Sequence, residues 1–371
     1  MHLHGMWKTN NYPTVMTLSF PLIQTKKKLI NRYDQHNKAH NMLKVVRYTY
    51  ENAQEWDGFV EGSKNGTFLF MRAYMDYHSD RFKDHSLMIY DCNESKTRLV
   101  GLLPANEKDT TLYSHQGLTY GGLVLSRKAH IAEVGEIFTA IKDYLRGNGF
   151  RKLIYKQIPK VYHTLPSEED EYWLWRHNAT KVGCAVMTAV DLYATTNGTT
   201  SSRKGTTHNK LVREGYKVVT DAPITDFWPL LTSNLMERFN AKPVHSLDEI
   251  LRLQSAFPKN IRCCTVVSPT GETIAGTLLF ISKQVVRTQY ISASHEGKLH
   301  NALDLLMPEL IAMSRKNETY RYFDFGTSMA TDGESLNTGL LQQKEGFGGR
   351  SIACNVYSID ISEDGNGQQT S

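Results

Sequence analysis

Apolar and polar positions alternate along the chain at two spacings, and the order of those spacings predicts its secondary structure. In the first half the pattern predicts strands at 85–91, 99–107 and 110–117, a helix over 130–150 and a strand at 152–156. Within this helix the apolar residues recur at steps of three and four, as one buried face requires. These residues are Ile131, Val134, Ile137, Phe138, Ile141, Tyr144 and Leu145.

The second half repeats this order of elements. The pattern predicts a hairpin at 263–281, a strand at 285–297, a helix that begins near Asn301 and a strand at 320–326. The tetrapeptide SHQG (114–117) precedes the first helix, and SHEG (294–297) precedes the second. The shared order and the sequence echo together favour two related domains of mixed α/β (α+β) class.

A small, polar stretch at residues 195–210 separates the halves and is interpreted as the connection between two domains. Further helices are expected at 224–239, at 246–257 with a Ser-x-x-Glu capping box, and at 335–347, before a last strand at 350–360. The predicted divisions are a poorly ordered basic extension (1–41), a first domain (42–200), a second domain (201–361) and a disordered polar tail (362–371).

Composition is typical of a globular protein, with 40% hydrophobic and 22% charged residues. The net charge of +5 arises entirely within residues 1–41, and the rest of the chain is neutral, so general affinity for nucleic acid is not implied. The basic extension is interpreted either as a loosely ordered tail or as an artefact of an upstream start codon. Its apolar run at 15–23 is short and lacks a small-residue cleavage site, so a signal peptide is not expected.

Cysteine usage indicates a cytoplasmic protein with reduced thiols. The five cysteines are odd in number and have no zinc-type spacing, so neither a disulfide framework nor a metal site is expected. Cys263 and Cys264 are adjacent in a predicted strand and face opposite ways, which predicts one in the core and one at an edge. No apolar run reaches the roughly 18 residues that a membrane span needs.

Two motifs near the C-terminus point falsely to a nucleotide site. The tripeptide Asp-Phe-Gly at 324–326 resembles the magnesium-binding motif of protein kinases, but the upstream kinase motifs are absent. The glycines at 346–349 form neither a G-x-G-x-x-G nor a Walker sequence. They are expected to end a helix and to let the chain reverse into the last strand.

Six stretches in a fixed order carry a family resemblance. They lie at 65–87, 114–123, 155–170, 242–250, 288–294 and 322–350, within a region from Met42 to about Ile361. In this order they resemble tandem-GNAT proteins related to the Fem-type peptidyltransferases. The resemblance implies two GNAT-like domains, each a mixed, mostly antiparallel sheet flanked by helices. It also implies direct attack of an amine on an activated acyl group, with backbone N–H groups for the oxyanion and a helix N-terminus for donor phosphates.

The resemblance leaves the substrates open. It implies acyl-CoA or aminoacyl-tRNA as the donor, and a small molecule, an amino sugar, a nucleotide-sugar or a cell-surface precursor as the acceptor. The main hypothesis is an N-acyltransferase. The alternatives are a Fem-type aminoacyl-tRNA-dependent peptidyltransferase and a non-catalytic binding protein on the same fold. The stretch 203–217 has a net charge of +4 and is interpreted as an RNA contact or as a solvated interdomain helix.

Three residues are candidates for catalysis. Lys344 stands in a Lys-x-x-Phe-Gly sequence similar to the Fem-type signature, where the resemblance implies that the lysine stabilises negative charge in the acyl channel. The alternative interpretation of Lys344 is structural, because a cation is favoured near the C-terminus of a helix. Tyr290 is the candidate general acid, with strand packing as its alternative. His163, in the loop after 152–156, is the candidate base, with a capped loop as its alternative.

The remaining candidates are expected to bind substrate. Lys156, His115 and Arg238 are expected to orient the acceptor in a cleft between the domains. The alternative for the candidates as a group is a structural role, in which their rings pack or their side chains cap the ends of helices and strands. The set comprises His115, Tyr120, Lys156, Tyr162, Arg238, His245, Gln289 and Asp324.

Overall fold

A computed structural model describes residues 42–93, 96–194 and 202–361. The predicted basic extension and polar tail lie outside the described residues. The described residues from Leu43 onward form one compact unit, and the description below concerns that unit.

The first half consists of short strands around one long helix. Its strands are β1 (Met42–Arg47), β2 (Lys83–Asp84), β3 (Leu87–Asn93), β4 (Lys96–Leu103), β5 (Asn106–Lys108), β6 (Thr111–Tyr113), β7 (Val124–Leu125), β8 (Lys152–Lys156) and β9 (Thr180–Asp191). Its helices are α2 (Ala53–Gly62), α3 (Arg72–Met75), α4 (Ile131–Gly147) and α5 (Glu169–Arg176). The amphipathic pattern of α4 is confirmed, since Val134, Ile137, Phe138, Ile141 and Leu145 are buried.

The second half repeats the plan with longer strands. Its elements are α6 (Ser202–Arg213), β10 (Lys217–Thr220), α7 (Ile224–Phe239), α8 (Leu247–Ala256), β11 (Ile261–Val267), β12 (Thr273–Ser282), β13 (Val285–Ala293), α9 (His295–Leu299), α10 (Leu303–Lys316), β14 (Tyr322–Thr327), α11 (Thr338–Glu345) and β15 (Arg350–Asp360). The capping box of Ser246 and Glu249 is present at the start of α8.

The described strands form one large sheet and one small sheet. The large sheet has the order β10-β11-β12-β13-β14-β9-β15-β8-β6-β5-β2, and the small one β1-β3-β4-β7. In the large sheet β6 pairs with β8 and β13 with β14 in parallel, and its other pairs are antiparallel, as are β3–β4 and β4–β7 of the small sheet. In both halves the repeated tetrapeptide follows the first strand of the parallel pair. The predicted class, mixed and mostly antiparallel sheets flanked by helices, is confirmed.

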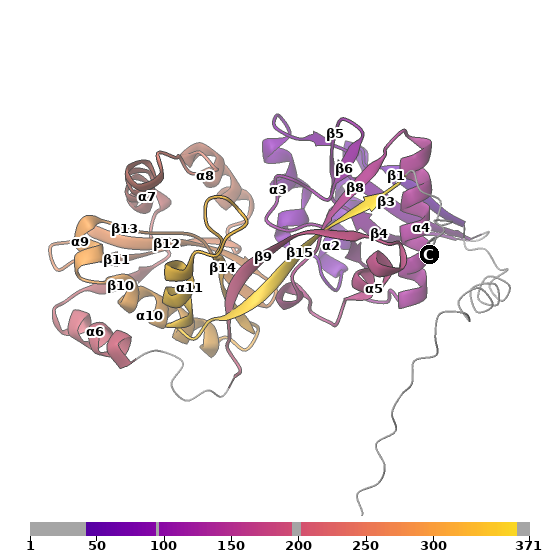
Figure 1. The fold of residues 1–371 in the computed structure, drawn as a ribbon. Helices are drawn as coiled ribbons and strands as arrows, with labels where there is room; N and C mark the ends of the chain where they lie inside the picture. The colour runs from indigo at the N-terminus through magenta and orange to yellow at the C-terminus, as the bar shows by residue number, and fades with distance from the viewer. Residues whose placement is uncertain (1–41, 94–95, 195–201, 362–371) are drawn as a thin grey trace, which may run out of the picture. The chain divides into compact units, whose positions relative to one another are not determined.

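The last strand of the chain returns to the first half. β15 pairs along most of its length with β9 and, near its end, with β8 (Figure 1). The large sheet therefore passes from one half into the other without a break. The predicted division at residue 200 is not tested by this pairing and stays a prediction.

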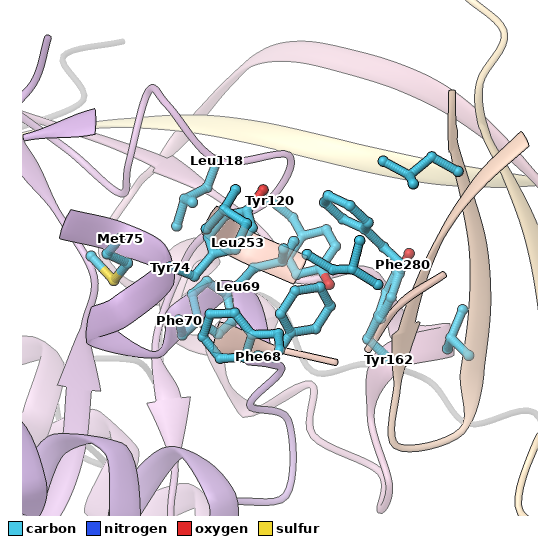
Figure 2. Packing of buried hydrophobic residues seen from close by; sticks show 14 of the residues in the cluster. Phe68, Leu69, Phe70, Tyr74, Met75, Leu118, Tyr120, Tyr162, Leu253 and Phe280 are labelled. Carbon is cyan, nitrogen blue, oxygen red and sulfur yellow. The ribbon is translucent and has the colours of Figure 1, made fainter. Parts of the chain in front are cut away.

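A shared hydrophobic core joins the two halves. Phe68 of the first half lies 5.4 Å, centroid to centroid, from both Phe257 and Phe280 of the second half. Figure 2 shows Phe68, Phe70 and Tyr74 gathered beside Phe280. Full burial of each such side chain stabilises the fold by about 1.5–3 kcal/mol.

One local expectation was wrong. Cys263 and Cys264 are both buried, because β11 has a hydrophobic cluster on each face and the two thiols enter different clusters. The stretch expected as a polar connection is helical from Ser202 onward. Leu211, further along α6, is buried in the core of the second half, so this helix packs on that half. The role of the stretch as a connection between two domains stays a prediction. Residues 195–201 of that stretch lie outside the described residues.

Candidate functional site

The two parallel strands of the second half separate before they end. β13 and β14 pair from Val285↔Tyr322 to Arg287↔Asp324, although β13 continues to Ala293. On its other side β13 carries a bulge, because Tyr290 pairs with Leu278 and Thr288 with Leu279, which leaves Gln289 as an extra residue. Bulges bend a strand and redirect its side chains, and they are frequent beside active sites.

A cavity of about 510 Å³ lies where β13 and β14 have separated. We call it the β13–β14 slot. Its described lining residues include three cations and no carboxylate, on walls that are otherwise largely apolar. They are Asn234, Arg238, Ile291, Ser292, Ala293, Lys298, Leu303, Met307, Phe325, Leu340, Gln343, Lys344 and Phe347.

Lys344 is the buried cation of the slot, with 4% of its surface exposed. Its ammonium donates to the carbonyl oxygens of Gly326 (3.1 Å) and Thr327 and to Ser328 Oγ (3.1 Å). Burial lowers the pKa of Lys344 to about 8. All three acceptors are neutral, so the ammonium adds net positive charge to the wall of the slot. Its predicted catalytic role stays a prediction.

Ser292 is a lining residue that sequence reasoning missed. The residue is 3% exposed, and its hydroxyl has no hydrogen-bond partner among the described residues. A buried hydroxyl without a partner costs about 1–3 kcal/mol, so each such group needs an explanation. The only signal in the sequence is a serine on a strand that borders the predicted channel.

Tyr290 precedes the lining residue Ile291 on β13 and forms a short hydrogen bond with His245; neither of the two residues lines the slot. The distance from Tyr290 Oη to His245 Nδ1 is 2.6 Å, and the backbone N–H of His245 also approaches the hydroxyl at 3.4 Å. Burial raises the pKa of Tyr290 to about 12 and lowers the pKa of His245 to about 4. Both groups are therefore neutral near pH 7, and the hydroxyl is the natural donor to the imidazole.

A row of stacked rings continues from His245 into the first half. Tyr77 stacks on His245 with centroids 5.3 Å apart, His78 stacks on Tyr77 at 4.4 Å, and His115 stacks on His78 at 5.2 Å. Burial, and then His78, lowers the pKa of His115 to about 3, so its ring is neutral. The structure thus brings together the predicted residues His115, His245 and Tyr290. Tyr77 and His78 were missed, although they lie in the first stretch of the resemblance.

Tyr120, Tyr162 and Asp324 are buried, and Asp324 precedes the lining residue Phe325 on β14. Asp324 is fully buried and accepts from Tyr162 Oη (2.7 Å), Arg287 Nη1 (2.9 Å) and the N–H of Gly326 (2.7 Å). The Tyr120 ring lies 4.5 Å from the Tyr162 ring. Burial, and then Asp324, raises the pKa of Tyr162 well above its usual value. The cluster holds the last pair of the β13–β14 ladder.

Lys156 and His163 lie in the first half. The Lys156 ammonium donates to the carbonyl oxygens of Leu118 (2.7 Å) and His115 (3.3 Å), and burial lowers its pKa to about 8. His163 Nε2 is 3.1 Å from the Ile158 carbonyl oxygen, and burial lowers its pKa to about 4. Neither residue lines the β13–β14 slot, whereas Arg238 and Lys344 do, and Gln289 forms the bulge beside it.

Within the described residues, no three His, Cys, Asp or Glu side chains are grouped as a metal ion would require. None of the described helices combines the length and the apolar character needed to cross a bilayer.

Comparison with known proteins supports the fold. No family model and no curated protein matches the sequence. The structure is similar to that of FemX, with a TM-score of 0.61 and 10% identity over 85% of this chain and 97% of the other. It is also similar to L-PGS from Bacillus licheniformis, with a TM-score of 0.51 and 13% identity over 86% and 94% of the two chains. A third similar structure is that of a conserved protein from Bacteroides thetaiotaomicron. Its TM-score is 0.52, with 10% sequence identity over 86% of this chain and 100% of the other. The chain therefore has the Fem-type fold that the resemblance implied.

Proposed function

We propose that the protein is an N-acyltransferase that binds its acyl donor in the β13–β14 slot and transfers the acyl group to an amine. The observation that carries the proposal is the separation of β13 and β14 beyond Arg287 and Asp324, with a cavity of about 510 Å³ in the opening. An extended donor arm entering there meets a strand edge whose ladder has ended, so its amides can take up the backbone hydrogen bonds that β14 no longer makes.

The charges of the slot suit a phosphorylated donor. Arg238 and the exposed Lys298 line it together with Lys344, and Lys298 Nζ donates to Asn234 Oδ1 at 2.5 Å. Cations near an apolar slot attract the phosphates of acyl-CoA or of a charged tRNA end while the acyl arm is buried. Ser292 offers an unpaired hydroxyl to a polar group of that arm.

The reaction balances with groups that this chain supplies. The amine nitrogen attacks the acyl carbonyl and forms the new C–N bond, and backbone N–H groups of β13 and the charge of Lys344 stabilise the oxyanion. Collapse of the intermediate breaks the bond to the leaving sulfur or oxygen, which takes a proton from Tyr290. The tyrosinate, which accepts from the backbone N–H of His245, recovers a proton from the acylated nitrogen. His163 lies outside this route, and the acceptor is a small molecule, an amino sugar or a cell-envelope precursor.

A slot-filling substitution tests the proposal. Leu340 lines the slot, whereas its neighbour Leu341 on the same helix is also half-buried but is not a lining residue. We expect Leu340→Trp to abolish the thermal shift given by acetyl-CoA and by other acyl-CoAs, while Leu341→Trp retains it. At a hundred times its dissociation constant a ligand adds about 2.7 kcal/mol of stability. A shift that survives in Leu340→Trp places the donor elsewhere.

Aminoacyl-tRNA is the second candidate donor, because the fold is shared with Fem-type proteins. The basic stretch at 203–217 gives it little support, since Lys204 is buried against Asp304 and Lys210 lies 3.7 Å from Glu214. Binding of charged tRNA would weaken steeply with salt, whereas binding of one acyl-CoA would weaken only slightly. A protein that binds donor without turnover would instead be the non-catalytic form of the fold.

A further inference from the structure

Lys204 connects α6 to α10 and to the end of α11, two of the helices that line the β13–β14 slot. The side chain is almost fully buried, with 6% of the residue exposed. Its ammonium lies 2.7 Å from Asp304 Oδ1 in α10 and 3.7 Å from the centroid of the Phe347 ring, just after α11. A buried ammonium needs a counter-charge, and an aromatic face adds to its stabilisation. One side chain therefore spans the gap between α10 and the end of α11.

Both partners of Lys204 belong to the walls of the slot. Phe347 lines the slot, and its ring stacks on Phe325, another lining residue, with centroids 5.7 Å apart. Asp304 follows the lining residue Leu303 in α10. The Lys204 side chain packs closely against Gly346 at the end of α11, because a Cβ at Gly346 would lie 2.8 Å from Lys204 Cε. A shift of the lysine would therefore reach the slot through Phe347.

The docking of α6 on α10 does not depend on Lys204 alone. His208 Nε2 lies 2.8 Å from Glu309 Oε1 of α10, and Leu211 is buried in the core of the second half. These contacts are further along α6 than Lys204. They keep the helix in place when the lysine is changed, so the effect of Lys204 on Phe347 can be measured separately.

We propose that Lys204 is a positioning residue that sets the width of the β13–β14 slot by fixing Phe347 and α11 against α10. The inference rests on the proposed function, in which the slot holds the acyl donor. In this proposal α6 contributes to donor binding, although none of its described residues lines the slot.

The test separates positioning from stability with a pair of variants. Lys204→Met keeps the stem but leaves Asp304 buried without its counter-charge, which destabilises the fold. In the double variant Lys204→Met/Asp304→Leu both charges are gone, and stability is expected to recover. Acetyl-CoA is expected to bind the double variant about tenfold more weakly than wild type, because the contact that holds Phe347 is still missing. Lys204→Arg, which keeps the charge, is the matched control and is expected to bind within about threefold of wild type.

Two outcomes would overturn the proposal. One is a double variant that recovers both stability and wild-type affinity, which would make the pair purely structural. The other is a loss of turnover at saturating donor with unchanged affinity, since a residue that shapes the slot affects donor binding first.

Hydrogen exchange distinguishes failure of this inference from failure of the proposed function. In the unliganded double variant, amides of 338–347 are expected to exchange faster than in wild type, while those of 208–213 are unchanged. This measurement needs no donor. If the wild-type protein binds no acyl donor, the proposed function is wrong. If the amides of 338–347 exchange at the same rate in the double variant as in wild type, Lys204 has no positioning role, whether or not a donor binds.

Discussion

The protonation of Lys344 is expected to make the rate of acyl transfer depend on pH. Burial lowers its pKa to about 8, from an ordinary value above 10. The ammonium can stabilise an oxyanion only while it is protonated, so kcat/KM is expected to fall as pH rises through about 8. Lys344→Arg stays charged and is expected to lose this falling limb, and Lys344→Ala to lower kcat by about 100-fold or more. The measurement is a pH–rate profile of the three proteins.

Lys156 provides the control, because burial also lowers its pKa to about 8 and it lies outside the slot. Lys156→Met should keep the falling limb. A limb that persists in Lys344→Arg would belong to another group. The free energy of unfolding is expected to change with pH in the opposite direction to kcat/KM. The folded protein binds fewer protons than the unfolded chain between about pH 8 and 10.5, so both lysines make the fold more stable as pH rises through that window.

The candidate site was predictable at the residue scale only where the sequence carries a motif. Lys344 stands in a recognisable spacing, and Arg238 follows from its place near a helix end; both line the slot. Ser292 and Lys204 were not singled out, because the importance of Ser292 depends on its burial and that of Lys204 on Asp304 and Phe347, which are distant in the sequence. The missing hydrogen bond of Ser292 and the contact of Lys204 with Phe347 are properties of packing alone.

At the scale of elements, the repeated tetrapeptide has a physical explanation in its glycine. A Cβ at Gly297 would lie 2.1 Å from the Ile274 carbonyl oxygen, so α9 can approach β12 only without a side chain there. A Cβ at Gly117 would lie 2.5 Å from the Phe82 ring. The two copies keep the glycine for close packing, against backbone in one and against aromatic rings in the other.

Replacement of these glycines is expected to be costly. Gly297→Ala should lower the free energy of unfolding by about 1–3 kcal/mol, because backbone must move to make room. Gly117→Ala should cost less, since side chains can shift. Gly147, at the end of α4, has no atom within 4 Å of an added Cβ and provides the control, expected within about 0.5 kcal/mol of wild type. Urea titration followed by circular dichroism measures all three, and equal values for Gly297→Ala and Gly147→Ala would contradict the explanation.

The elements themselves were largely predictable, because hydrophobic periodicity is local. The helix α4, the capping box of α8 and the hairpin of β11 and β12 follow the pattern closely. The bulge at Gln289 and the separation of β13 from β14 did not follow from it. Both are matters of register between strands, and register depends on partners that the spacing within one strand does not specify.

At the scale of the whole molecule, the sequence indicates a repeat but not how the copies are joined. The pattern ends the second half with a strand at 350–360, and nothing in that strand shows that it pairs with β8 and β9. The aromatic contacts of Phe68 with Phe257 and Phe280 are equally invisible, because each residue looks like ordinary core of its own half. A shared sheet and a shared core make the two halves depend on each other for stability.

This dependence predicts that the two halves unfold together. Phe68→Ala leaves a cavity in the shared core and is expected to cost about 3–5 kcal/mol. Phe138 lies in a separate cluster, formed by residues of the first half and of the C-terminal end of β15, so Phe138→Ala is the matched control. In denaturant, hydrogen exchange of α4 and of α10 should report one common midpoint for each protein, lowered by both substitutions. If Phe138→Ala lowered the midpoint of α4 and left that of α10 unchanged, the halves would be independent folding units, and the continuous sheet would not couple them.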